Sequence, residues 1–181
     1  MIYESHYWKD DLLKSAKALK RKINQKRWSQ ASSSKLEKIL LYGFYAVRKL
    51  IEAKKLSQAV SETKMPTKTY GWKGKNVNIL NWLKIDELYD FDREIEIIKP
   101  VLFYCHQFVH SYILIEAFDE DKFLVGIYFS SEKDRHKMLY YLEINQIIDL
   151  FVLIGEDYPS NFSLIYNKNI FDYDIVDNDQ A

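Results

Sequence analysis

The sequence predicts an α+β fold with a helical N-terminal layer of three to four helices, a mostly antiparallel β-sheet, and one helix in the C-terminal half. Apolar residues recur at helical spacing through most of residues 7–56. Aromatic and β-branched residues instead form short runs after residue 111, as is typical of strands. The 181 residues are 48% hydrophobic, enough to bury a core. We expect a single domain over 1–181, mainly helical and basic-to-acidic over 1–111 and β-rich and acidic over 112–181.

Two amphipathic helices are expected at the start of the chain. The first covers residues 7–23. Its buried stripe comprises Trp8, Leu12, Ser15, Ala16, Leu19 and Ile23. The second is expected from Ser34, where Ser34-Lys35-Leu36-Glu37 has the form of a capping box, to about Leu56. Gly43 lies in the apolar stripe of this second helix and predicts the close approach of another helix.

Residues 57–100 are expected to hold a loop, a short strand at 67–72, a short helix over 78–89, and a short strand that leads to Pro100. Pro100 suits the first turn of a further helix, where its missing N–H is not needed. On that helix Val101, Cys105, Phe108, Val109 and Tyr112 share one side, and His106 and His110 lie on the other.

After residue 111 the sequence predicts an antiparallel meander of three strands over 112–118, 123–129 and 138–144. A helix over 145–154 and a final hairpin of 162–166 with 170–175 follow. Residues 177–181 are expected to form a frayed acidic tail.

The charge is strongly divided along the chain, although the net charge is zero. Residues 1–75 hold 18 Lys and Arg against 6 Asp and Glu, a net charge of +12, and residues 76–181 carry the opposite net charge. The basic half could meet an anionic partner such as nucleic acid. Alternatively the two halves could pair, within one chain or across a homodimer.

Eight residues are candidate contacts for nucleic acid. Six lie on or just after the first helix, and two belong to a run that interleaves aromatic and basic residues. They are Lys14, Lys17, Arg21, Lys22, Lys26, Arg27, Trp72 and Lys73. Such residues can stack bases and hold phosphates. They are also compatible with a solvated helix face and a short aromatic hairpin.

Several function classes lack their sequence signals. The chain has no Gly-rich phosphate loop, G-x-S-x-G, C-x-x-C or H-E-x-x-H motif, and we expect no cofactor. We expect no metal site either, because the pair His106 and His110 has no third ligand that the sequence singles out. A lone cysteine, no signal-peptide pattern and no apolar run near ~18 residues predict a cytoplasmic protein without a membrane partner.

The segment from Cys105 to His110 resembles the active-site motif of HEPN-domain nucleases. That motif has Arg, then Asn, Asp or His, then three residues and a His, on a helix of an α-bundle. His106 and His110 match its last two elements, whereas Cys105 stands where the family has Arg. The resemblance implies a metal-independent ribonuclease in which His does acid–base work. Arg48 is then the candidate for the missing cation, although its spacing from Glu52 also fits a surface ion pair.

Nearly the whole chain also resembles a group of small bacterial proteins of unknown function. Four segments carry this resemblance: residues 4–9, 43–52, 107–112 and 155–159. Relatives in that group carry Asn at the position of His106, which makes His110 the better single candidate. A structural role for His110, at the switch from helix to strand, also stays open.

These observations favour a small binding module for nucleic acid or a protein partner. The alternative is a divergent HEPN-like ribonuclease of the toxin or phage-defence type, centred on His110 with His106 and Arg48 as further candidates. Whether the protein is an enzyme is left open by the sequence.

Overall fold

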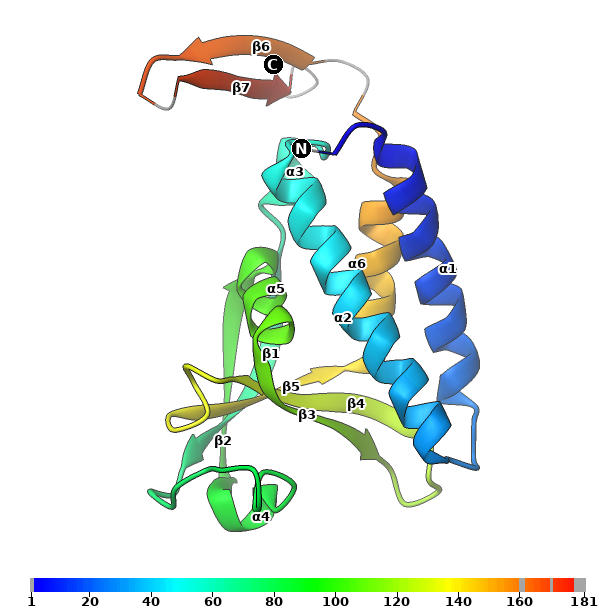
Figure 1. Ribbon diagram of the computed structural model, residues 1–181, viewed down its shortest axis with the longest axis vertical. Coiled ribbons are helices and arrows are strands. Elements are labelled where there is room, and N and C mark those ends of the chain that lie inside the picture. Colours follow the sequence, from blue (N-terminus) through cyan, green and yellow to red (C-terminus); the bar gives the residue numbers. More distant parts are fainter. Residues whose placement is uncertain (1, 160–161, 170, 178–181) are drawn as a thin grey trace.

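The computed structural model describes residues 2–159, 162–169 and 171–177, and it confirms the α+β fold class (Figure 1). The helices are α1 (Ser5–Ile23), α2 (Gln30–Glu52), α3 (Gln58–Ser61), α4 (Ile85–Leu88), α5 (Val101–Val109) and α6 (Ile144–Glu156). The strands are β1 (Lys64–Trp72), β2 (Tyr89–Pro100), β3 (Ser111–Phe118), β4 (Leu124–Ser131), β5 (Met138–Glu143), β6 (Phe162–Asn167) and β7 (Asp172–Asp177). The expected tail lies outside the described residues, apart from Asp177.

Five strands form one antiparallel sheet in the order β2-β1-β5-β4-β3. Consecutive pairing of β3, β4 and β5 confirms the expected meander. The strands β1 and β2 extend the sheet from β5, so two of its five strands come from before residue 112. They are longer than the short strands expected there, because each finds a neighbour that satisfies its backbone groups.

Helices α1, α2 and α6 form a layer over one part of the sheet, and α5 packs against α2 (Figure 1). The Phe44 ring of α2 stacks on Phe108 of α5, with centroids 3.9 Å apart, and meets the edge of Phe151 on α6. Gly43 permits this packing, since a Cβ there would lie 2.3 Å from the Phe151 ring. The predicted close approach of another helix at Gly43 is therefore confirmed.

The helix α2 begins four residues before the expected Ser34. Its N-cap is Ser29, whose hydroxyl accepts a hydrogen bond from the Ser32 N–H, and the helix ends at Glu52. The predicted start was displaced because Ser29 caps the helix upstream, where its carbonyl accepts from the Ser32 and Ser33 N–H groups, so Ser34 already lies within the helix. A capping box does occur, but at α6, between Glu143 and Gln146.

The expected helix over 78–89 is wrong for most of its length, since only α4, residues 85–88, is helical. The side chains of Asn78 and Asn81 accept hydrogen bonds from backbone N–H groups at 78 and 80, which favours turns. The stretch nevertheless covers the face of the sheet opposite α1, α2 and α6, where Val77, Ile85 and Leu88 pack in a second, smaller core.

The final hairpin is confirmed as β6 paired with β7, and Figure 1 shows it beyond α3, apart from the main sheet. The Lys54 ammonium donates a hydrogen bond to the Tyr173 carbonyl and joins the hairpin to the end of α2. Every helix among the described residues is too short or too polar to traverse a lipid bilayer.

Candidate nucleic-acid interface

Three of the predicted contact residues lie together on the outer side of α1. Lys14, Lys17 and Arg21 are exposed and follow one another at helical spacing. The Lys14 ammonium pairs with the Asp11 carboxylate at 2.8 Å, which raises the pKa of Lys14. The side chains of Lys17 and Arg21 have no hydrogen bond or ion pair within the described ranges. Two cations of this row are thus unpaired and directed to solvent.

The basic residues at the end of α1 are partly engaged with the protein itself. Lys22 is half-buried, donates to the Gln25 side chain at 3.2 Å, and lies 4.8 Å from the centre of the Trp28 ring. Burial lowers the pKa of Lys22, and the nearby Lys35 ammonium lowers it further. Lys26 lies over the Phe123 ring, and Arg27 is exposed. Lys22 is therefore less available to a ligand than the residues of the outer row.

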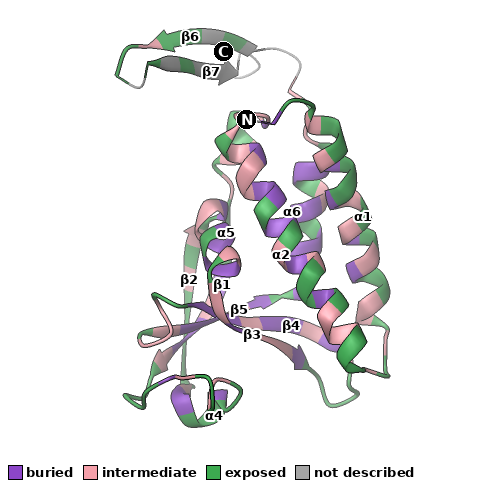
Figure 2. Cartoon of the chain, viewed as in Figure 1, coloured by how far each residue is buried: buried purple, intermediate pink, exposed green. Residues whose placement is uncertain are grey.

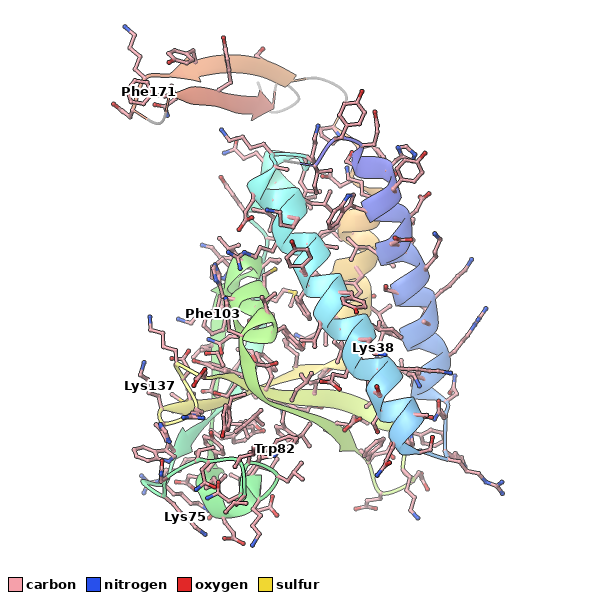
Figure 3. The ribbon with its side chains drawn as sticks, viewed as in Figure 1. Lys38, Lys75, Trp82, Phe103, Lys137 and Phe171 are labelled. Atoms are coloured by element: carbon pink, nitrogen blue, oxygen red, sulfur yellow. The ribbon has the colours of Figure 1, made fainter. Side chains whose placement is uncertain are left out.

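The helix α2 adds a second row that the sequence reasoning missed. Lys35, Lys38, Tyr42 and Tyr45 are all exposed and repeat at intervals of three and four, so they lie on one face. Figure 2 shows exposed positions along the side of α2 turned to the viewer, and Figure 3 labels Lys38 there. The same spacing is present in the sequence, but only the apolar stripe of this helix was predicted, and not its exposed row.

A hollow of about 290 Å³ lies between α1 and α2, next to this second row. Its aromatic lining comes from Trp8 of α1 and from Tyr42 and Tyr45 of α2. The ring centroids of Trp8 and Tyr45 are 6.3 Å apart. Backbone and small side chains at Gly43 and Ala46 leave the space open between these rings. The surface of α1 and α2 thus combines two rows of cations with an aromatic hollow, and we call it the α1–α2 face.

Trp72 and Lys73 do not join the α1–α2 face. They lie at the end of β1, where the Trp72 indole N–H donates to the Lys75 carbonyl and Lys73 donates to the Asp86 carbonyl. Figure 3 shows Lys75 of this loop on the side of the molecule away from α1. Of the eight predicted contacts, the structure brings together only those on α1 and its end.

The two oppositely charged halves make few ion pairs with each other. Within the described residues, the pairs that cross from 1–75 to 76–181 are Lys68 with Glu94, at 3.0 Å, and Lys75 with Glu87. Both involve β1 or the loop that follows it. No ion pair in this part of the chain joins α1 or α2 to the acidic half, so the acidic half does not neutralise the cations of the α1–α2 face.

The histidine candidates are both on the surface of α5 and its end. His106 and His110 are exposed, whereas Cys105 between the helices is fully buried, and burial raises the pKa of its thiol to about 12. Arg48 donates to the Glu52 carboxylate at 2.6 Å, in agreement with the surface ion pair that its spacing allowed. The position that matches the nuclease Arg thus faces the core and not the surface that carries the histidines.

The junction after α5 is held by backbone and by a glutamine. The His110 carbonyl accepts from the Glu132 N–H at 3.0 Å, while its ring has no hydrogen bond among the described residues. The buried Gln107 side chain accepts from the Ser131 N–H and donates to the Asp134 carboxylate at 2.6 Å. Burial favours a raised pKa for Asp134, but hydrogen bonds from Gln107, Lys137 and Tyr140 outweigh it and lower the pKa. Sequence reasoning missed Gln107, which looked like an ordinary polar helix residue.

No group of three or more His, Cys, Asp or Glu side chains in the described part of the chain is placed to hold a metal ion. No family model, curated protein or solved structure matches the chain. The geometry and charge of the α1–α2 face are therefore the main indications of function.

Proposed function

We propose that this protein is a binding module that holds nucleic acid on its α1–α2 face, in the cytoplasm. The observation that carries the proposal is that the acidic half does not neutralise the cations of this face, with the side chains of Lys17 and Arg21 unpaired among the described residues. A polyphosphate backbone gains affinity from such a surface because counterions are released when phosphates are neutralised. Both side chains are exposed, which leaves them available to a ligand.

The first prediction is that replacement of the outer row of α1 weakens this binding. Lys14→Glu, Lys17→Glu and Arg21→Glu together should reduce affinity for a labelled oligonucleotide by about tenfold or more at low salt. The slope of log affinity against log salt should fall by about 2 to 3, because three phosphate contacts are lost. Fluorescence anisotropy over a salt series measures both quantities.

A matched control changes the net charge equally at exposed lysines outside the face. Lys64→Glu, Lys133→Glu and Lys168→Glu together should bind nearly as the parent does. An equal loss in this control would reduce the effect to overall charge and contradict the assignment of the face. A parent protein that binds no oligonucleotide at low salt would overturn the proposal and favour a protein partner.

A further inference from the structure

The aromatic hollow gives the α1–α2 face a feature that phosphate binding does not require. Tyr42 is 71% exposed and Tyr45 46% exposed, so a large part of each side chain is in water. Both line the hollow with Trp8, and neither ring has its hydroxyl hydrogen-bonded within the described residues. Exposed aromatic rings beside lysines form the usual platform on which single-stranded nucleic acids stack their bases.

The charges around the hollow separate the places for bases and for phosphates. Asp11 lines the hollow, and its carboxylate would repel a phosphate placed there. An uncharged base meets no such penalty and gains contact with the rings. The cations that are unpaired among the described residues lie further along both helices, with Lys17 on α1 and Lys35 and Lys38 on α2. Lys14 instead pairs with Asp11. A strand can therefore place its phosphates on these rows while a base enters the hollow.

Duplex nucleic acid cannot place a base in the hollow unless that base is first unpaired and unstacked. Its bases are stacked and paired inside the helix, and unstacking one costs a few kcal/mol. Unpaired bases are already free to stack on protein rings.

We propose that the ligand of the α1–α2 face is single-stranded nucleic acid, with an unpaired base stacked in the hollow formed by Trp8, Tyr42 and Tyr45. This inference rests on the proposed function and specifies its substrate class. It assigns Lys35 and Lys38 to the sugar–phosphate backbone and the two tyrosines to the bases.

The second prediction compares three probes of equal strand length, about twelve nucleotides, the order of the site sizes of such proteins. They are a single-stranded oligonucleotide, its duplex, and a single strand of the same charge in which abasic residues replace the bases. The parent should bind the single strand about tenfold more tightly than the abasic strand, because stacking is lost while the phosphates remain. It should also prefer the single strand to the duplex.

The tyrosine variants test where the stacking occurs. Tyr42→Ala with Tyr45→Ala should bind the normal single strand as weakly as the abasic strand, a loss of about tenfold. Tyr42→Phe with Tyr45→Phe should retain binding, since the rings remain. Phe171→Ala removes an exposed ring on the β6–β7 hairpin, labelled in Figure 3, and should have no effect.

The outcomes separate this inference from the proposed function. Equal affinity for normal and abasic strands, or tighter binding to the duplex, would overturn the stacking role. The inference would then fail while the loss of binding in the α1 glutamate variant still upheld the basic face. Absence of binding to all three probes would overturn both. Because the abasic comparison uses the parent protein, it holds even if a tyrosine variant misfolds.

Discussion

The Lys9 side chain is only 1% exposed, although it belongs to a residue type that is rarely buried. Its ammonium donates to the Lys55 carbonyl at 3.0 Å and to the Asp157 carbonyl, and it lies 4.3 Å from the centre of the Tyr158 ring. These contacts join α1 to the ends of α2 and α6. Burial lowers the pKa of Lys9, and the Asp157 carboxylate opposes that shift.

The third prediction follows from this burial. Lys9→Met should destabilise the fold by about 1–3 kcal/mol at neutral pH, because two carbonyls lose their donor. The folded pKa lies below the unfolded value of about 10.4, so the unfolded chain binds the extra proton between these two values. Stability of the parent should therefore rise with pH in this window, and the variant should lack that rise.

Urea unfolding at several pH values up to about 10 measures both effects against Lys20→Met, an exposed lysine on the same helix. If the stability of Lys9→Met rose with pH as much as that of the parent, Lys9 would not be the source of the rise.

Residue-level burial was the least predictable feature of the chain. Lys9 falls at helical spacing with Leu12, Ala16 and Leu19, but residue type argued against burial. The burial of Gln107 was not predicted either, because glutamine is also mostly an exposed residue type. Only the folded chain shows that carbonyls and a carboxylate from distant segments meet these two side chains.

Among the elements, the contact between α2 and α6 is set by the absence of a side chain at Gly43. A Cβ there would lie 2.3 and 2.5 Å from two carbons of the Phe151 ring, closer than atoms can approach. The ring is fully buried, and its neighbour Phe44 is buried as well, so it has little room to move.

The fourth prediction is that Gly43→Ala destabilises the protein by about 1–3 kcal/mol through overpacking. This loss should outweigh the gain of up to about 1 kcal/mol that Ala normally brings to a helix interior. Gly71→Ala is the control, because a Cβ there meets nothing within 4 Å. Urea unfolding of both variants measures the difference.

Phe151→Leu should reduce the penalty of Gly43→Ala in the double variant, as expected when two sites share one contact. Additive effects of the two changes would show that the penalty arises elsewhere.

The sequence predicted those helices and strands in which apolar residues repeat regularly along the whole element. The helices α1 and α6 and the strands β3, β4 and β5 were found within a few residues of their ends, because each carries a continuous helical or extended apolar pattern. The errors fall where side chains compete with backbone hydrogen bonding, at Ser29 and at the two asparagines before α4. The pairing of β1 with β5 depends on a long-range contact that no local pattern encodes.

The candidate interface was predictable only in part, for a related reason. Helical spacing correctly grouped the outer row of α1, since one helix fixes its own faces. It could not show that α2 lies beside α1, that a hollow forms between them, or that Trp72 is remote. Those facts follow from packing between elements.

Over the whole molecule, one group of acidic residues lies far from the α1–α2 face. The α1–α2 face is basic, whereas the edge strand β2 exposes Asp92, Glu94 and Glu96 on the far side of the sheet from α1 (Figure 1). Charged side chains on an edge strand also discourage pairing with another chain. Other acidic residues lie close to the end of α1: Glu116 interacts with Lys22, and Asp119 lines a hollow with Ile23 and Asn24. The division of charge along the sequence is therefore only partly a division in space.

The fifth prediction is that moderate salt stabilises this fold. Like charges on the α1–α2 face repel one another, and the screening length falls from about 10 Å at 0.1 M salt to about 3 Å at 1 M. If opposite halves were paired, salt would weaken attraction and lower the melting temperature. Few ion pairs join the halves among the described residues. Sodium chloride should therefore raise the melting temperature, by about 2–4 °C for each 1 kcal/mol gained in the free energy of unfolding.

Thermal melts from about 0.05 to 0.5 M sodium chloride test this, and the glutamate variant of Lys14, Lys17 and Arg21 supplies the comparison. That variant removes repulsion from the face, so its melting temperature should respond less to salt. A fall in melting temperature of the parent on addition of salt would instead show that attraction between the basic and acidic halves dominates the electrostatics of the folded chain.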